Sequence, residues 1–223
     1  MQTMEHDFQY ISKHDPQVKA AYADLMLLLR EVSKDLKKHY TFQRKPVGSY
    51  ARNMITYDQK SNVGFDFDFN IYPNYDEEEY DAKQIKLLFK KALDNHVKDH
   101  GFDYAEDSTR VLTIKQKDRK HSRILFSVDF AFVYNYTDED GTQRQQYIRH
   151  NKKQGVYAWE DQPKGYYMLP EKISWIKEQE LWTSELRPYY LAKKNANTDP
   201  DTHSRTIFTI AVHEICQKYG YYQ

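Results

Sequence analysis

The sequence predicts an α+β fold, with helices and a sheet in residues 1–145 and a mostly helical region in residues 146–223 packed against it. Two observations carry this prediction: apolar residues recur at helical spacing in some segments and alternate with polar residues at strand spacing in others. The composition agrees, because aromatic residues make up 15% of the 223 residues while Gly and Pro number 7 each, a mixture typical of an ordered domain.

The first helix is predicted to begin at Asp15-Pro16 and to continue to about Tyr40. Asp is favoured at a helix N-cap, and Pro is favoured in the first helical turn. The apolar residues that follow at helical spacing are Val18, Ala21, Leu25, Leu28, Leu29, Val32 and Leu36. A second helix is predicted after the acidic residues of 76–81, which suit a helix N-terminus, and Gly101 would end it.

Three strands are predicted around this second helix. Residues Val63 to Tyr72 alternate in polarity and are followed by Pro73-Asn74, which would end the strand. Residues Val111 to Ile114 and Ile124 to Tyr136 form two further apolar runs, joined by a charged turn, so we expect them to be neighbours in the sheet.

The composition of the chain changes after Gln145, where basic and aromatic residues are mixed and apolar residues recur with little regular spacing. Helical spacing returns from Leu169, and a terminal helix is predicted over Thr206 to Tyr219. The chain contains no flexible linker that would separate independent domains, which is why we expect the two regions to pack together.

Paired acids in the first strand are the most informative motif. In the run Phe65-Asp66-Phe67-Asp68-Phe69, side chains two residues apart point the same way, so both carboxylates leave one face. Like charges held so close repel one another, which favours a cation between them. Mg²⁺ prefers carboxylate oxygens and completes its shell with water and phosphates. The alternative is an amphipathic edge strand with its acids in water.

Two further features stand in a fixed order around the paired acids. Gly48-Ser49 follows the first helix, where backbone N–H groups and a hydroxyl suit phosphate oxygens. Asp129 is a lone acid in the later apolar strand, and three acids on neighbouring strands would form a two-metal phosphoryl-transfer site.

Together these motifs resemble the DNA polymerase β-like nucleotidyltransferase superfamily, over about residues 17 to 135. The resemblance implies a mixed sheet flanked by helices. It also implies that Gly48 and Ser49 hold the phosphates of a nucleotide and that Asp66, Asp68 and Asp129 bind catalytic Mg²⁺ or Mn²⁺. One departure is the spacing of Ser49 and Asp66, since the insert Asn53 to Gly64 calls for a longer hairpin or loop.

The resemblance therefore implies a metal-dependent enzyme that transfers an NMP from an NTP to an acceptor hydroxyl and releases pyrophosphate. We expect ATP as the NTP, and the acceptor stays open among nucleotide, RNA and protein. The layout looks most like the branch of oligoadenylate synthetases and bacterial cyclic-oligonucleotide synthetases, which make oligonucleotide or cyclic products. The alternatives are a toxin–antitoxin type transferase that modifies a protein or tRNA, and a non-enzymatic nucleotide-binding module.

Three other residues are candidates for substrate binding. Arg52 follows the Gly-Ser turn and would assist it, unless it is an ordinary surface arginine. Tyr136, like Tyr134, is expected to share the face of Asp129 and to stack on a nucleobase, with a structural aromatic as the alternative. Lys177 is one of several cations in the helical region that would meet the triphosphate.

Charge and cysteine content limit the partners and the location. Lys plus Arg and Asp plus Glu both number 33, so no global field attracts nucleic acid. The single cysteine, Cys216, excludes an intramolecular disulfide and a Cys-rich zinc site. We expect a cytoplasmic protein without a membrane partner, because no segment approaches 18 apolar residues and no signal peptide is evident at residues 1–7.

Overall fold

The computed structural model describes residues 6–58, 60, 64–199 and 201–221. The chain divides into two compact units. The larger unit takes its residues from 11–56 and 62–162, and the smaller takes them from 1–10, 57–61 and 163–223. No helix in the described ranges is long and apolar enough to cross a membrane.

The larger unit contains a seven-stranded mixed sheet, so the predicted α+β fold with helices flanking a mixed sheet is confirmed. The main strand order is β2-β4-β7-β6-β5, and β8 and β9 extend it from the far part of β7. Only the β4–β7 pair is parallel among the strand pairs of this sheet. The strands are β2 Thr41–Val47, β4 Phe65–Asn74, β5 Glu106–Asp107, β6 Val111–Asp118, β7 Arg123–Thr137, β8 Gln143–Asn151 and β9 Val156–Asp161.

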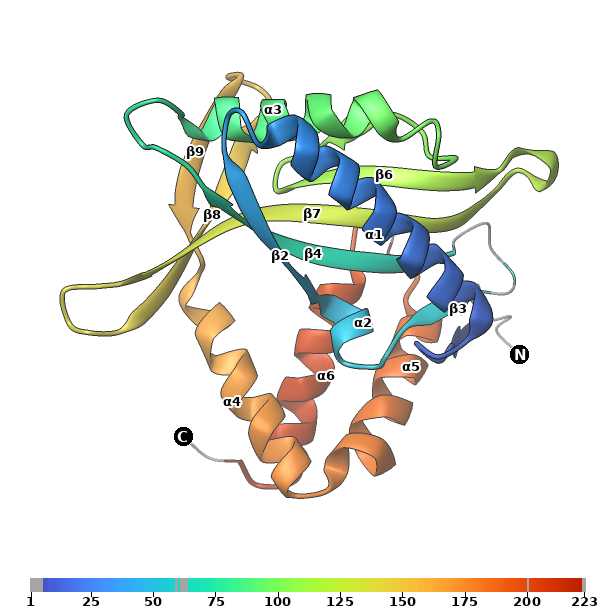
Figure 1. Ribbon diagram of the computed structural model, residues 1–223. Coiled ribbons are helices and arrows are strands. Elements are labelled where there is room, and N and C mark those ends of the chain that lie inside the picture. The colour runs from blue at the N-terminus through green and yellow to red at the C-terminus, as the bar shows by residue number, and fades with distance from the viewer. Residues whose placement is uncertain (1–5, 59, 61–63, 200, 222–223) are drawn as a thin grey trace. The chain divides into compact units, whose positions relative to one another are not determined.

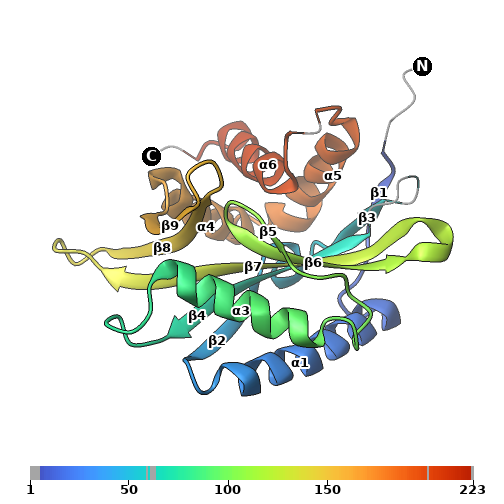
Figure 2. The ribbon, with the colours of Figure 1, turned by 90° about the horizontal axis from the view of Figure 1, so that it is seen from above.

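Helices α1 (Pro16–Leu36) and α3 (Ala82–His96) lie side by side on one face of this sheet (Figures 1 and 2). Each begins with an aspartate N-cap: Asp15 accepts from the Gln17 N–H at 2.8 Å, and Asp81 forms a capping box with Gln84. Short connections complete the unit, namely α2 (Gly48–Ala51) and the 3₁₀ turn η1 (Arg119–His121).

The core lies between these helices and the aromatic side of β4. Phe65, Phe67 and Phe69 are at most 2% exposed, whereas Asp66 between them is exposed. Phe89 of α3 packs edge-on against Phe132 of β7, with ring centroids 5.1 Å apart. Burial of these rings on one face only is what fixes the register of the strands, since a slip of one residue would put the acids into the core.

The smaller unit combines a two-stranded sheet with the C-terminal helices. Its strands are β1 (Phe8–Tyr10) and β3 (Thr56–Asp58), and β3 lies within the insert between residues 53 and 64. Tyr10 donates a hydrogen bond to the Arg187 carbonyl at 2.8 Å, which ties β1 to the helices. The helices are α4 Lys164–Glu178, the π-helix η2 Trp182–Leu186, α5 Arg187–Ala196 and α6 Ser204–Lys218. Cys216 of α6 is a buried free thiol.

Several boundaries differ from those expected. Helix α1 ends at Leu36 instead of about Tyr40, and β4 continues through Pro73. Pro73 is tolerated because the pairing of β4 with β7 ends at Ile71, so the strand has β2 as its neighbour there. The predicted boundary at residue 145 falls inside β8, and helices begin only after residue 162. Strands β8 and β9 were not predicted because many of their residues are polar and do not alternate with apolar ones. An example is the ion pair of Arg149 with Glu160, whose atoms are 3.1 Å apart.

Candidate functional site

The parallel pairing of β4 with β7 brings the three acids to one face of the sheet. In its register, Asp68 is directly opposite Asp129, and Asp66 is opposite Ser127. Residues that face each other across a strand pair share a face, and Asp66 and Asp68 share theirs through the two-residue period. This face is the one turned away from α1 and α3, because those helices contact the phenylalanines.

Asp129 is half-buried, as Asp68 is, whereas Asp66 is exposed. The Thr113 hydroxyl on β6 donates a hydrogen bond to Oδ1 of Asp129 at 2.5 Å. Burial, together with the negative charges of Asp68 and Asp66, raises the pKa of Asp129 to about 6, although the Thr113 hydrogen bond acts in the opposite direction. The carboxyl therefore titrates close to neutral pH, where it can gain and lose a proton.

The three carboxylates share a face but do not converge on one point. Across the described residues, no three acidic, histidine or cysteine side chains are grouped closely enough to hold a metal ion. Ser127 hydrogen-bonds Asp66 and Thr113 hydrogen-bonds Asp129, and both interactions direct a carboxylate toward its own neighbour. Mutual repulsion favours the same separation, so a shared cation would have to draw the carboxylates together.

Gly48 borders the carboxylate of Asp68. The last residue of β2, Val47, pairs with Asp68, and Gly48 follows with φ +62° in the left-handed region. A Cβ at Gly48 would lie 1.8 Å from Asp68 Oδ2, so any side chain there would clash with the carboxylate. Glycine is required at this position both by the backbone conformation and by the close approach.

Aromatic stacking holds the turn that carries Ser49. Tyr50 stacks on Tyr22 of α1 with ring centroids 4.8 Å apart and meets Phe67 of β4 edge-on at 5.3 Å. The Ser49 carbonyl accepts from the Met54 N–H at 2.8 Å. Ser49 is half-buried, and its hydroxyl has no hydrogen-bond partner among the described residues, so the hydroxyl is available to a ligand.

The other candidate residues fall in different places. Arg52 ends the short helix α2, where its N–H donates to the Gly48 carbonyl at 3.3 Å, so it is adjacent to the turn. Lys177 lies on α4 in the smaller unit, with its Nζ 4.9 Å from the centre of the Trp182 ring. The structure adds no contact that assigns either residue to a substrate.

The expectation that Tyr134 and Tyr136 share the face of Asp129 is wrong. They follow Asp129 by five and seven residues, and odd separations lead to opposite faces of a regular strand. The side-chain hydroxyl of Tyr136 donates to Asp161 on β9 at 2.8 Å, in the part of β7 that pairs with β8. Its role in stacking on a nucleobase is therefore not supported by the strand geometry from which it was inferred.

Sequence reasoning missed the residues that support the acids. Thr113 and Ser127 are polar residues in apolar strands, and Thr113 stands directly opposite Asp129 in the β6–β7 register. The sequence shows that these two residues are polar. It does not show that they lie beside the acids, because that depends on the register between strands distant in the chain. The Tyr22–Tyr50 stack was missed for the same reason, because it joins two elements that are distant in the sequence.

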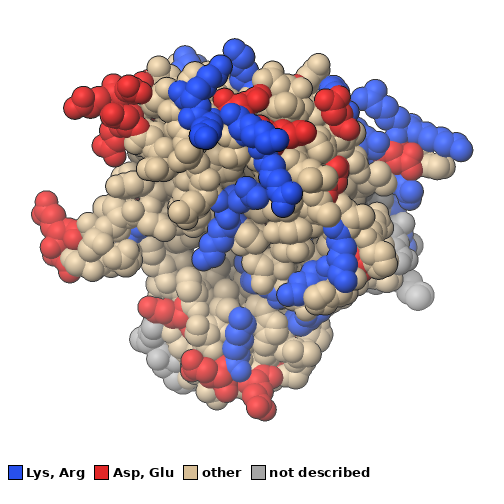
Figure 3. Space-filling view, viewed as in Figure 1, with Lys and Arg blue, Asp and Glu red and all other residues tan. Residues whose placement is uncertain are grey.

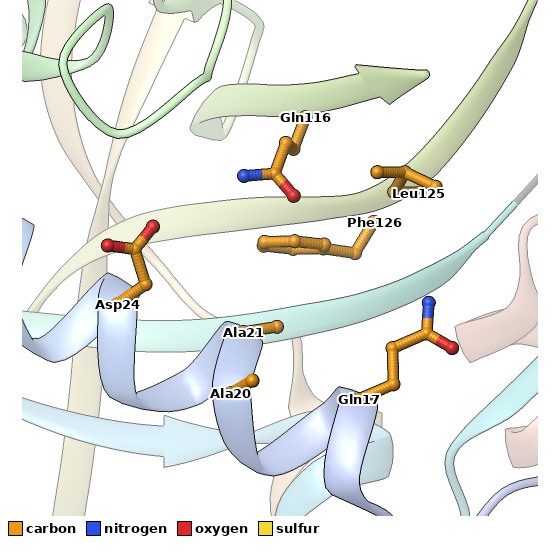
Figure 4. A pocket seen from close by; sticks show the side chains of 7 residues that line it. All are labelled: Gln17, Ala20, Ala21, Asp24, Gln116, Leu125 and Phe126. Atoms are coloured by element: carbon orange, nitrogen blue, oxygen red, sulfur yellow. The ribbon is translucent and has the colours of Figure 1, made fainter.

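A separate hollow of about 300 Å³ lies between α1, β6 and β7 (Figure 4). Phe126 lines it, together with Gln116 and Asp24. Phe126 belongs to the buried set of β7, on the face opposite Asp129. The hollow is therefore distinct from the face that carries the acids.

The chemistry of the acid face fits a divalent cation of the Mg²⁺ type. Its donors are carboxylate oxygens, which are the ligands that Mg²⁺ and Mn²⁺ prefer. The Asp68 carboxylate lies directly against Gly48, in space that a Cβ at this position would need. The raised pKa of Asp129 reflects burial next to other negative charges, a situation that a bound cation would relieve.

Comparison with solved structures shows which fold this is. The chain is similar to the cyclic dinucleotide synthase CdnE of Elizabethkingia meningoseptica, solved with GTP and Apcpp, with TM-score 0.53, 14% identity and coverage of 91% of this chain and 70% of that one. It is also similar to the di-nucleotide cyclase DncV of Vibrio cholerae in complex with GTP, with TM-score 0.55 and 13% identity. DncV of Escherichia coli, bound to 3'-deoxy GTP, gives TM-score 0.51 and 15% identity.

These likenesses show that the chain shares its fold with these cyclic dinucleotide synthases, a mixed sheet flanked by helices as the motifs predicted. The match to the two DncV structures covers 89% and 87% of this chain but only 55% and 52% of theirs, so the chain spans about half their length. No protein-family model matches the sequence, and no curated protein matches it either.

Proposed function

We propose that this chain, which has the fold of the DNA polymerase β-like nucleotidyltransferases, is a metal-dependent nucleotidyltransferase that makes oligonucleotide or cyclic-nucleotide products from NTPs. The observation that carries the proposal is the direct opposition of Asp68 and Asp129 on one face of the sheet, beside Gly48. Similar solved structures of cyclic dinucleotide synthases, described with GTP or with a linear dinucleotide intermediate, support the choice of product class.

Asp66, Asp68 and Asp129 would hold the divalent cations, Mg²⁺ or Mn²⁺. Bound there, the cations would supply positive charge to the phosphate oxygens and lower the pKa of the acceptor hydroxyl. Ser49 and the backbone of its turn would hold the phosphates of the donor, for which we propose ATP. The Tyr50 stack keeps this turn in place, so phosphate binding would not have to order it.

Asp129 would receive the proton of the acceptor hydroxyl. The acceptor oxygen forms a bond to the α-phosphorus of the NTP, the bond from that phosphorus to the pyrophosphate oxygen breaks, and pyrophosphate leaves. The geometry that supports this role is the position of Asp129, directly opposite Asp68 on the same face of the sheet. Thr113 would keep its carboxylate oriented for this transfer.

Incubation with each labelled NTP, in Mg²⁺ and in Mn²⁺, tests the proposal when the products are separated by size and linkage. The expected result is a 3'–5' or 2'–5' linked oligonucleotide or a cyclic product, with pyrophosphate released. Labelled AMP on a co-purified protein or tRNA would instead overturn the choice of acceptor. A wild-type protein that turns over no NTP would leave only a non-enzymatic binding role. Turnover that survives Asp68→Asn would refute catalysis at this site.

A further inference from the structure

Lys45 of β2 lies on the same face of the sheet as the three acids. In the antiparallel β2–β4 register, Val47 pairs with Asp68 and Lys45 pairs with Asn70. Directly opposed residues share a face, so Lys45 and Asn70 follow Asp68 at a spacing of about 7 Å along the strands. Pro46 pairs with the buried Phe69 and belongs to the other face.

The face that carries the acids continues along β4 as a polar surface. On β4, Asn70 and Tyr72 are half-buried and Asn74 is exposed, whereas the intervening Ile71 is fully buried. Asn70 pairs with Ala131 of β7, a residue with a small side chain. Amide and hydroxyl groups on such a face can hydrogen-bond a polar ligand.

Lys45 supplies a positive charge to this surface. It is exposed, and within the described chain its ammonium group makes no ion pair. Val47 pairs with Asp68, so Lys45 lies beside Asn70, on the other side of Asp68 from the Gly48–Ser49 turn. Figure 3 shows Lys and Arg side chains, with Asp and Glu among them, over the turn between α1 and β2.

We propose that Lys45 binds the polyphosphate of the NTP, and that Asn70 beside it hydrogen-bonds the same nucleotide. This inference rests on the proposed function and extends it to a residue outside the acid and Gly-Ser motifs. The reason is charge: three carboxylates oppose the approach of a triphosphate, and a lysine on the same face offsets part of that repulsion.

Calorimetry with ATP in Mg²⁺, combined with steady-state kinetics, tests the role of Lys45. A charge-assisted contact to phosphate predicts that Lys45→Ala weakens ATP binding by about tenfold and raises KM by a similar factor, with a small change in kcat. Lys45→Arg should restore most of the affinity, because it keeps the charge. The matched control is Lys83→Ala, which removes an exposed lysine from α3 on the other side of the sheet and should leave ATP affinity unchanged.

Two failures can be told apart. If the wild type binds ATP and Asp68→Asn abolishes its turnover, but Lys45→Ala matches the Lys83→Ala control, the proposed function stands and the role of Lys45 is refuted. If the wild type neither binds nor turns over any NTP, both proposals fall. A loss of affinity in Lys45→Ala that Lys45→Arg does not restore would refute a role based on charge.

Discussion

Asp68 on β4 and Asp129 on β7 face each other directly in a parallel strand pair, although 60 residues of chain separate them. Their carboxylates leave the same face of the sheet, and the Asp68 carboxylate lies directly against Gly48. Both aspartates are half-buried, so the two carboxylates and the glycine turn form one surface.

Asp68→Asn should reduce product formation by more than about 100-fold, because loss of a group that merely hydrogen-bonds a metal ligand already costs up to about 100-fold in metal sites. The metal-free protein should keep its fold and become slightly more stable, because one of several repelling carboxylates is neutralised. Thermal melting in EDTA and product analysis in Mg²⁺ together check the prediction. Unfolding of Asp68→Asn would mean that the carboxylate is structural.

Gly48→Ala should lose activity and destabilise the fold, because a Cβ there would lie 1.8 Å from Asp68 Oδ2. The matched control is Gly155→Ala, whose φ of +67° is close to the +62° of Gly48 but whose Cβ would meet nothing within 4 Å. The control carries only the backbone cost, about 1–2 kcal/mol. Urea denaturation of both variants separates the two effects, and equal losses would refute the close approach.

The alternation of acids and phenylalanines in β4 was predictable from the sequence, because a strand with a two-residue period must separate Asp66 and Asp68 from Phe65, Phe67 and Phe69. The support given by Thr113 and Ser127 was not, since it depends on the register between distant strands. Strands β8 and β9 were missed because their paired residues are largely polar.

His100 should make folding stability depend on pH. Its Nδ1 lies 2.7 Å from Asp24 and its Nε2 lies 3.0 Å from Glu31, both on α1. Burial alone would lower the pKa of His100, but the hydrogen bonds and charges of these carboxylates outweigh it and raise the pKa. A raised histidine pKa contributes stability that is fully present below the unfolded-state pKa, about 6.5, and is lost as pH rises through the folded-state value.

His100→Gln should therefore cost more free energy of unfolding at pH 6 than at pH 9, measured by urea denaturation at both values. His14→Gln, at an exposed position before α1, is the control and should show no such difference. An equal cost of His100→Gln at both pH values would contradict the role of the protonated ring. His96 also lies near Glu31, with its Nδ1 3.7 Å from the carboxylate. Its titration should therefore be followed in His100→Gln as well.

Lys86 and Asp107 form a buried ion pair. Removing the lysine and removing the aspartate should lower the free energy of unfolding by different amounts. Lys86 is fully buried, its Nζ is 2.8 Å from Asp107 Oδ1, and Tyr157 donates to the other carboxylate oxygen at 2.6 Å. Burial lowers the pKa of Lys86, and Asp107 opposes that effect. Asp107→Ala should cost about 3–5 kcal/mol, since it leaves a buried ammonium group without a counter-ion.

Lys86→Met should cost clearly less, because the partly exposed carboxylate of Asp107 keeps its hydrogen bond from Tyr157. Chemical denaturation of the two single variants gives the order. A larger cost for Lys86→Met than for Asp107→Ala would show that apolar packing of the lysine, and not its charge, sets the stability of this cluster.

The affinity for ATP in Mg²⁺ compared with EDTA, measured by calorimetry, tests the central claim most directly. Without metal, the triphosphate approaches three acids, and each like-charge pair at about 4 Å costs about 4 kcal/mol at an effective dielectric of about 20, before screening. Binding should therefore be clearly tighter in Mg²⁺, and Asp68→Asn should lose most of that gain. Equal affinity in Mg²⁺ and EDTA would contradict a metal-dependent nucleotide site at Asp66, Asp68 and Asp129.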